Sequence, residues 1–171
     1  MTNYLKSILF FLSLFLFFSC SEEESFILNE ESIAIEDISN VSIFHKSNGV
    51  NYEVTTEFIK EKWESELLEE GIEVELERFI ILESKDKLNS KNYYFLKAIS
   101  KDGTLETGAF LNKIETKNLS ISASFELAGK KCSCTGCTNG CAIEVVGSKC
   151  TCTSCIPRGG KCTKKEEQVV E

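Results

Sequence analysis

Hydrophobic residues follow a helical period in one stretch near the middle of the chain. Ile59, Trp63 and Leu67 recur at every fourth position, and most of the residues between them are Lys or Glu. This spacing is typical of an amphipathic helix with a single apolar stripe. Thr55 or Thr56 can cap its N-terminus, because a Thr hydroxyl accepts a hydrogen bond from a free backbone N–H of the first turn.

After Gly71, which suits the left-handed conformation that follows many helices, the hydrophobic period changes to two. Apolar and polar residues then alternate in several stretches, as they do in half-buried strands. Asp102-Gly103 indicates a tight hairpin between the second and the third stretch, and Gly108 is a candidate bulge. The predicted strands cover residues 72–82, 93–100, 105–114 and 119–127.

These elements predict an α+β fold, in which one helix packs on a small antiparallel β-meander and a cysteine-rich, loop-rich C-terminal module follows. The apolar stripe of the helix is expected to cover one face of the sheet. Glu73, Glu75 and Glu77 alternate with apolar residues, as do the serines of residues 119–127, so the other face is expected to be open to water. A domain over residues 41–129 is long enough to bury its own core.

An apolar run without charged residues lies near the N-terminus. Residues 8–18 read ILFFLSLFLFF and follow a single basic residue, Lys6. Eleven residues of helix rise about 16 Å, roughly half of the hydrocarbon thickness of a bilayer. A charged start, a short apolar middle and a small residue at the end are typical of a secretory signal peptide, which we predict over residues 1–19.

The residues around Cys20 resemble the lipobox of bacterial lipoproteins, in which a small residue precedes a cysteine that becomes the lipidated N-terminus. Ser19 and Cys20 match that pattern, whereas Phe17 and Phe18 stand where Leu and a small residue are usual. Phe-rich variants of this kind resemble lipoproteins of the Bacteroidetes, and Ser21 with the acidic triplet after it resembles their signal for transfer to the cell surface. The resemblance implies fatty acyl (palmitate-type) anchoring at Cys20 in the outer membrane, facing the exterior. Ordinary secretion, with Cys20 lost or left free, is the alternative.

Charge is unevenly distributed along the chain, whose formal net charge is −8. Residues 20–129 hold 11 basic and 23 acidic residues, whereas residues 130–171 hold seven basic and four acidic residues. The net charge argues against nucleic acid as the main partner, because phosphate binding needs a basic face. The change near residue 129 predicts a domain boundary. The acidic residues 20–40 predict a tether behind the lipid, part of which adds a strand or packs on the domain.

Eight of the nine cysteines lie in a duplicated segment of the C-terminal module, residues 130–171. The first copy has the spacing C-x-C-x2-C-x3-C and the second copy has the spacing C-x-C-x2-C-x6-C. Because the segment has few sizeable apolar residues, cross-links rather than a hydrophobic core must hold it together. The cysteines of the duplication are Cys132, Cys134, Cys137, Cys141, Cys150, Cys152, Cys155 and Cys162.

Two kinds of cross-link explain these cysteines. An even number in an exported chain indicates disulfides, here up to four. Neighbours in C-x-C are poorly placed to bridge each other, so each is expected to pair elsewhere and to join two short strands or the two repeats. Alternatively, the four thiolates of each repeat bind zinc or copper. Clustered C-x-C beside Lys resembles metallothioneins over residues 132–162, which implies a thiolate metal cluster.

The sequence contains no evident catalytic constellation. His45 is the only histidine and is expected on the surface or at a strand edge, away from a nucleophile. The three alternating glutamates indicate a solvated strand face rather than a pair of catalytic carboxylates. Tyr93 and Tyr94 are expected to pack across strands or to cap the sheet edge. No calcium-binding loop or phosphate-binding glycine loop is present in the sequence.

The sequence therefore predicts a non-enzymatic, lipid-anchored protein of the cell envelope with a disulfide-stapled C-terminal module and no cofactor. Its expected partners are the membrane, through the N-terminal lipid, and a protein or envelope ligand. That ligand would contact the open sheet face or the basic cysteine module. A metal-binding lipoprotein with a zinc or copper thiolate cluster is the alternative function.

Overall fold

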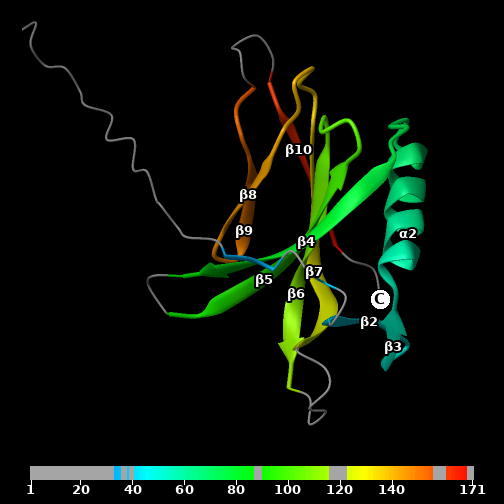
Figure 1. The fold of residues 1–171 in the computed structure, drawn as a ribbon, viewed down its shortest axis with the longest axis vertical. Coiled ribbons are helices and arrows are strands. Elements are labelled where there is room, and N and C mark those ends of the chain that lie inside the picture. The colour runs from blue at the N-terminus through cyan, green and yellow to red at the C-terminus, as the bar shows by residue number, and fades with distance from the viewer. Residues whose placement is uncertain are drawn as a thin grey trace, which may run out of the picture.

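A large mixed β-sheet dominates the structure, which is a computed structural model (Figure 1). It describes residues 33–35, 38, 41–86, 90–115, 123–155 and 161–168. The strand order is β1-β4-β5-β6-β7-β2-β3, with β10 added beside β7, and β8 and β9 form a separate hairpin. The elements are β1 (Ile33–Ile35), β2 (Val41–Ser47), β3 (Val50–Val54), α2 (Thr56–Glu69), β4 (Leu76–Lys85), β5 (Asn92–Ser100), β6 (Glu106–Ile114), β7 (Ala123–Thr135), β8 (Ile143–Val146), β9 (Lys149–Cys152) and β10 (Thr163–Gln168).

The predicted helix is confirmed. Helix α2 is capped by Thr55, whose hydroxyl accepts a hydrogen bond from the backbone N–H of Phe58 at 3.2 Å. Its buried residues are those of the predicted apolar stripe, Ile59, Trp63 and Leu67. Gly71 follows the helix with a φ of 79°, the left-handed conformation expected there.

The antiparallel order predicted for four strands is present, as β4, β5, β6 and β7 pair in sequence order. The first of them begins at Leu76 rather than at residue 72, and residues 119–122 of the last predicted strand lie outside the described residues. The role predicted for Gly108 is wrong. The irregularity in β6 falls between Ala109 and Leu111 instead. A side chain at Gly108 would collide with the ring of Phe95 and the backbone of Leu96, so glycine makes room here for a neighbouring aromatic residue.

The predicted fold class, α+β with a small meander, is wrong because the structure is mostly β. Four further strands extend the meander into an eight-stranded sheet, and β2 pairs with β7 in parallel, which makes the sheet mixed. Two of these added strands bury few side chains, although β3 (VNYEV) alternates apolar and polar residues. All but one residue of β3 are exposed, and β10 reads TKKEEQ. Backbone pairing with an existing edge, rather than side-chain burial, recruits such strands.

Strand β7 joins the two halves of the chain, because it pairs with three other strands. One edge of β7 pairs with β6, and the other edge pairs with β2 along its first half and with β10 along its second half. The strand runs through residue 129, where the charge pattern predicted a domain boundary. The sequence on both sides of that position therefore belongs to one sheet.

The central sheet is covered on both faces (Figure 1). On the helix face, α2 packs on Ile81, Leu96 and Phe125. The β8–β9 hairpin covers the opposite face of the sheet, which we call the hairpin face. There, Phe95 and Cys132 pack with residues of the hairpin. The expectation of a face open to water is therefore wrong for this central part of the sheet. The serines that suggested solvent exposure include Ser124, which is 1% exposed.

The acidic segment 20–40 contributes a strand, as expected. Strand β1 pairs antiparallel with β4, with Ile33 opposite Glu83. The predicted signal peptide, Cys20 and most of the predicted tether lie outside the described residues. Among the residues that the structure describes, no helix is long and apolar enough to cross a membrane.

Candidate functional site

Four disulfides cross-link the C-terminal module, as the even number of cysteines predicted. We call this set the disulfide ladder. Each cysteine of the first repeat bonds to the cysteine in the same position of the second repeat. The bonded pairs are Cys132–Cys150, Cys134–Cys152, Cys137–Cys155 and Cys141–Cys162.

The two repeats lie in register along this ladder. The first three pairs are each separated by 18 residues in sequence, and the fourth by 21 residues. The difference reflects the three extra residues before the last cysteine of the second copy. The expectation that neighbours in C-x-C bond elsewhere and tie the repeats together is confirmed.

Strands β7 and β9 position the first two disulfides of the ladder. Cys132 and Cys134 are two residues apart on β7 and therefore point to the same face, as Cys150 and Cys152 do on β9. The Cα–Cα distances of the two pairs are 6.7 Å and 5.7 Å. The hairpin is thus held against the sheet by covalent bonds.

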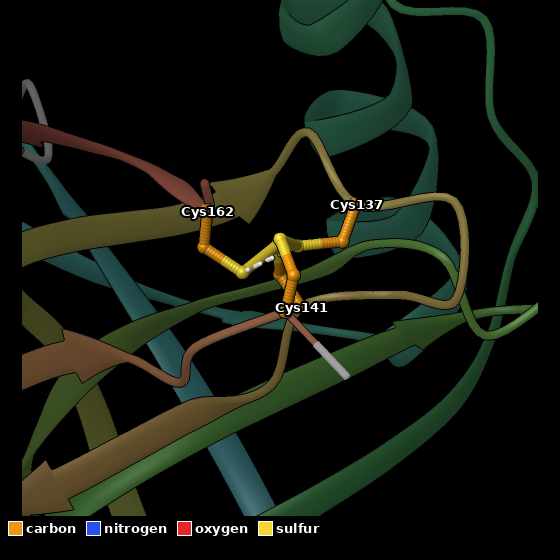
Figure 2. A group of neighbouring side chains, drawn as sticks. Cys137, Cys141 and Cys162 are labelled. Atoms are coloured by element: carbon orange, nitrogen blue, oxygen red, sulfur yellow. Dashed lines mark hydrogen bonds between the residues drawn. A yellow bond between two sulfur atoms is a disulfide. The ribbon is translucent and has the colours of Figure 1, made fainter. Parts of the chain in front are cut away.

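The other two disulfides lie at the end of the ladder where the chain leaves the strands. Cys137, Cys141, Cys155 and Cys162 come from loops, and their four sulfur atoms all lie within 4.8 Å of one another. The sulfur of Cys137 is 3.1 Å from that of Cys162, although the two belong to different disulfides (Figure 2). We call these four residues the loop-end cysteines.

A buried ion pair also fastens the hairpin to the sheet. Glu106 on β6 accepts hydrogen bonds from the Lys97 ammonium at 3.1 Å and from the backbone N–H of Ile143 at the start of β8. The side chains of Lys97 and Glu106 are only 13% and 11% exposed. At the other end of β8, the Ser84 hydroxyl accepts a hydrogen bond from the Gly147 N–H at 3.2 Å.

A cavity of about 600 Å³ lies on the helix face, between α2 and strands β2, β6, β7 and β10. We call it the helix–sheet pocket. Ile59, Trp63 and Ala109 line it and are at most 4% exposed. Phe58, which is 48% exposed, also lines it. Its size and apolar lining are typical of a small-molecule site.

Charged residues surround this apolar lining. The ammonium of Lys131, buried on β7, pairs with Glu66 of α2 and lies 6.0 Å from the centre of the Trp63 ring. Lys165 of β10 pairs with Glu167 and with Glu70 at the end of α2. Hydrogen bonds to these two carboxylates raise the pKa of Lys165. These ion pairs connect the helix to both strands that carry the lysines.

His45 of β2 also lines the helix–sheet pocket. Partial burial, reinforced by the positive charge of Lys62, lowers the pKa of His45 below its usual value. The imidazole therefore stays neutral to a lower pH than a free histidine does. The described residues that line the pocket include no serine, threonine or cysteine, so no nucleophile for a triad with His45 lies among them.

The other residues that the sequence analysis considered for function are exposed on the surface or pack within the fold. Glu73, Glu75 and Glu77 are exposed, as predicted, and Glu75 pairs with Lys101 at 2.9 Å. That hydrogen bond lowers the pKa of Glu75. Tyr94 packs on Phe125 with ring centres 5.0 Å apart, which confirms its packing across strands.

Sequence reasoning did not find the helix–sheet pocket. Its charged residues come from α2 and from the C-terminal module. These segments are far apart in sequence, since Lys131 and Glu66 are separated by 65 residues. The burial of Lys131 cannot be read from the local sequence, because Lys130 beside it is also a lysine. Which of the two side chains is buried depends on the alternation of side chains along β7.

Comparisons with known proteins identify no relative: no family model, curated protein or solved structure matches this chain.

Proposed function

We propose that the protein is a lipid-anchored, non-enzymatic binding protein of the bacterial outer membrane that faces the cell exterior. The lipobox-like residues 17–20 and the acidic triplet after them support the anchor and its orientation. The disulfide ladder fits an oxidising compartment outside the cytoplasm, because thiols stay reduced in the cytoplasm of most cells.

The helix–sheet pocket is the single observation that carries the binding function. It combines a buried apolar lining with charged groups around it, so an apolar or aromatic ligand with a polar group fits its chemistry. The lining described above offers no nucleophile next to His45, which favours binding over catalysis.

Intrinsic fluorescence tests this binding site directly, because Trp63 is the only tryptophan of the chain and lines the pocket. The probe is 1-anilinonaphthalene-8-sulfonate, an aromatic anion that accepts energy from excited tryptophan. We expect saturable binding of one dye per chain, with quenching of the Trp63 emission. A folded protein that leaves the dye and Trp63 unaffected would contradict the proposed pocket.

Two exposed apolar residues of α2 provide a matched pair of variants. Phe58 lines the pocket, whereas Leu68, which is 60% exposed, does not. Phe58→Ala is expected to weaken dye binding severalfold, and Leu68→Ala is expected to leave it unchanged. Equal weakening by both variants would place the dye on the outer surface of the helix instead.

Metabolic labelling with an alkyne-bearing fatty acid tests the anchor. The wild-type protein should carry the label, and Cys20→Ala should lose both the label and membrane attachment. Protease treatment of intact cells then tests the orientation. Digestion before the cells are lysed is expected for a surface-facing protein, whereas full protection would place the protein on the periplasmic side.

A further inference from the structure

We propose that the loop-end cysteines form a tetrathiolate site for one zinc ion when their two disulfides are reduced. The ladder would then have two alternative cross-links at this end, one covalent and one through metal. This inference concerns a different region from the helix–sheet pocket and does not depend on the binding function proposed above.

The positions of the four sulfur atoms support this site. Zinc binds thiolate sulfur at about 2.3 Å in a tetrahedron, which places the sulfurs about 3.8 Å apart. The four sulfurs of Cys137, Cys141, Cys155 and Cys162 all lie within 4.8 Å of one another, and the Cys137–Cys162 contact is 3.1 Å. Figure 2 shows the labelled side chains converging on one point from different segments. Small movements therefore suffice to bring all four onto one ion.

Two glycines shape the chain that leads into this cluster. All four residues lie outside the strands, and Gly136 and Gly140 precede Cys137 and Cys141 with φ values of 108° and 88°. Glycine adopts these angles without steric cost, so the chain turns sharply just before Cys137 and just before Cys141. The sulfurs are also shielded, since Cys137, Cys141 and Cys155 are between 1% and 8% exposed.

The other four cysteines of the ladder are less suitable. Cys132 and Cys134 are held by the pleat of β7, where residues two apart are separated by roughly 7 Å. Cys132 and Cys150 approach only one further described ligand, the carboxylate of Glu166. Lys164 already holds that carboxylate at 2.9 Å, and the hydrogen bond lowers the pKa of Glu166. This group therefore offers three ligands, one of which is already engaged.

The proposed set corrects the metal site that the duplication suggested. Sequence spacing assigned one site to each repeat, whereas the structure brings two cysteines of each repeat together at one place. Four thiolates in a tetrahedral arrangement favour zinc among the divalent ions.

The chemistry has two steps. Two equivalents of a dithiol reductant, each of which becomes a disulfide, transfer two electrons and two protons to each of the Cys137–Cys155 and Cys141–Cys162 bonds. The four resulting thiols then lose their protons as they bind one zinc ion, so four protons are released and the site carries a net charge of −2. Two equivalents of a disulfide oxidant reverse the process: they take four electrons from the bound thiolates and four protons from the solvent, the two cysteine disulfides form again, and the zinc ion is released.

Cysteine protection against alkylation tests the site. The full-length chain carrying Cys20→Ser is purified in detergent, reduced with a phosphine and titrated with zinc. Native mass spectrometry counts the bound ions, and alkylation followed by peptide mapping identifies the protected cysteines. We expect one zinc per chain and protection of the four loop-end cysteines only. Protection of the four cysteines of one repeat, two ions per chain, or no retained zinc would each overturn the proposal.

Paired variants separate this site from the rest of the ladder. Cys141→Ser/Cys162→Ser removes two of the four proposed ligands, and Cys132→Ser/Cys150→Ser removes an equal number of cysteines elsewhere. Zinc affinity should fall about tenfold or more in the first variant and stay within about twofold in the second. Similar losses in both variants would mean that zinc binds the reduced cysteines without a defined site. Both measurements use reduced chains, so a failure of the variants to form disulfides does not affect the comparison.

Discussion

The helix face and the hairpin face belong to the same sheet but are covered in different ways. On the helix face, α2 inserts the large side chains Ile59, Trp63 and Leu67, which are at most 4% exposed. On the hairpin face, the buried apolar residues of the hairpin strands are Ile143 and Val145, and most of the other buried residues of this cluster are cysteines.

This difference shows that one sheet can be covered by two elements, α2 and the β8–β9 hairpin, that are held in place by different forces. The helix is held by burial of apolar area, which is non-directional and tolerant of small shifts. The hairpin strands bury little apolar area, so covalent bonds and the Glu106 ion pair fix their position. Changes to one face should therefore have effects that differ in kind from changes to the other.

The largest effect is expected from complete reduction in the presence of a metal chelator. Removal of one native disulfide from a small secreted domain costs about 2–5 kcal/mol, so loss of all four should lower the free energy of unfolding by more than about 5 kcal/mol. Hydrogen exchange should show β8 and β9 losing protection while α2 and β5 retain it. Simultaneous loss of protection in α2 would show that the two faces do not act separately.

Trp63→Ala removes apolar packing between α2 and the sheet instead. Truncation of a fully buried tryptophan is expected to lower the free energy of unfolding by about 3–5 kcal/mol, measured by circular dichroism in urea with the disulfides intact. Leu68→Ala is the matched control on the same helix, because Leu68 is 60% exposed. Its expected effect is within about 0.5 kcal/mol. An equal effect of both variants would mean that the helix is not held through its apolar stripe.

Glu106→Gln weakens the polar attachment of the hairpin. The amide keeps an acceptor for the Ile143 N–H but leaves the buried Lys97 ammonium without its counter-charge. We expect a loss of about 2 kcal/mol, less than for removal of a whole buried partner. The control is Glu75→Gln in the Glu75–Lys101 pair, whose side chains are 57% and 58% exposed. That variant should leave the urea midpoint unchanged, and a comparable shift would contradict the role of burial.

The smallest effect concerns pH. Because burial and Lys62 lower the pKa of His45 in the folded protein, the unfolded chain binds the proton more readily. The free energy of unfolding should therefore fall slightly as pH decreases from the unfolded pKa, near 6.5, to the folded value. In His45→Gln, this contribution should disappear from urea midpoints measured across that interval. An unchanged pH slope would show that other groups cause it.

Several elements could be predicted from the sequence because their signals are local. The stripe of Ile59, Trp63 and Leu67 repeats within four residues, and the meander strands alternate within two. Strand β10 could not be predicted in this way because it has no apolar residue, and β3 alternates over only five residues. Their residues are mostly exposed, and they exist because β2 and β7 offer free backbone edges.

The cysteines also show what local sequence patterns cannot predict. Their number and duplication predicted disulfides that tie the repeats together. The pairing of Cys132 with Cys150 depends on how β9 lies against β7, and the convergence of Cys137 and Cys162 depends on the pairing of β7 with β10. Sequence spacing disfavours bonds between the neighbours in C-x-C but leaves most of the 105 pairings of eight cysteines open.

The sequence by itself determined the helix, the central meander and the cross-linked character of the C-terminal module, because periodicity and composition act over short stretches of chain. Only the tertiary structure decided that the module covers the second face of the sheet, which cysteines meet, and where a pocket opens. Those outcomes depend on β7, which directs Lys131 toward the helix and Cys132 toward the hairpin. Two adjacent residues therefore contact opposite faces, because side chains alternate along a strand. Their partners on the two faces come from distant parts of the chain.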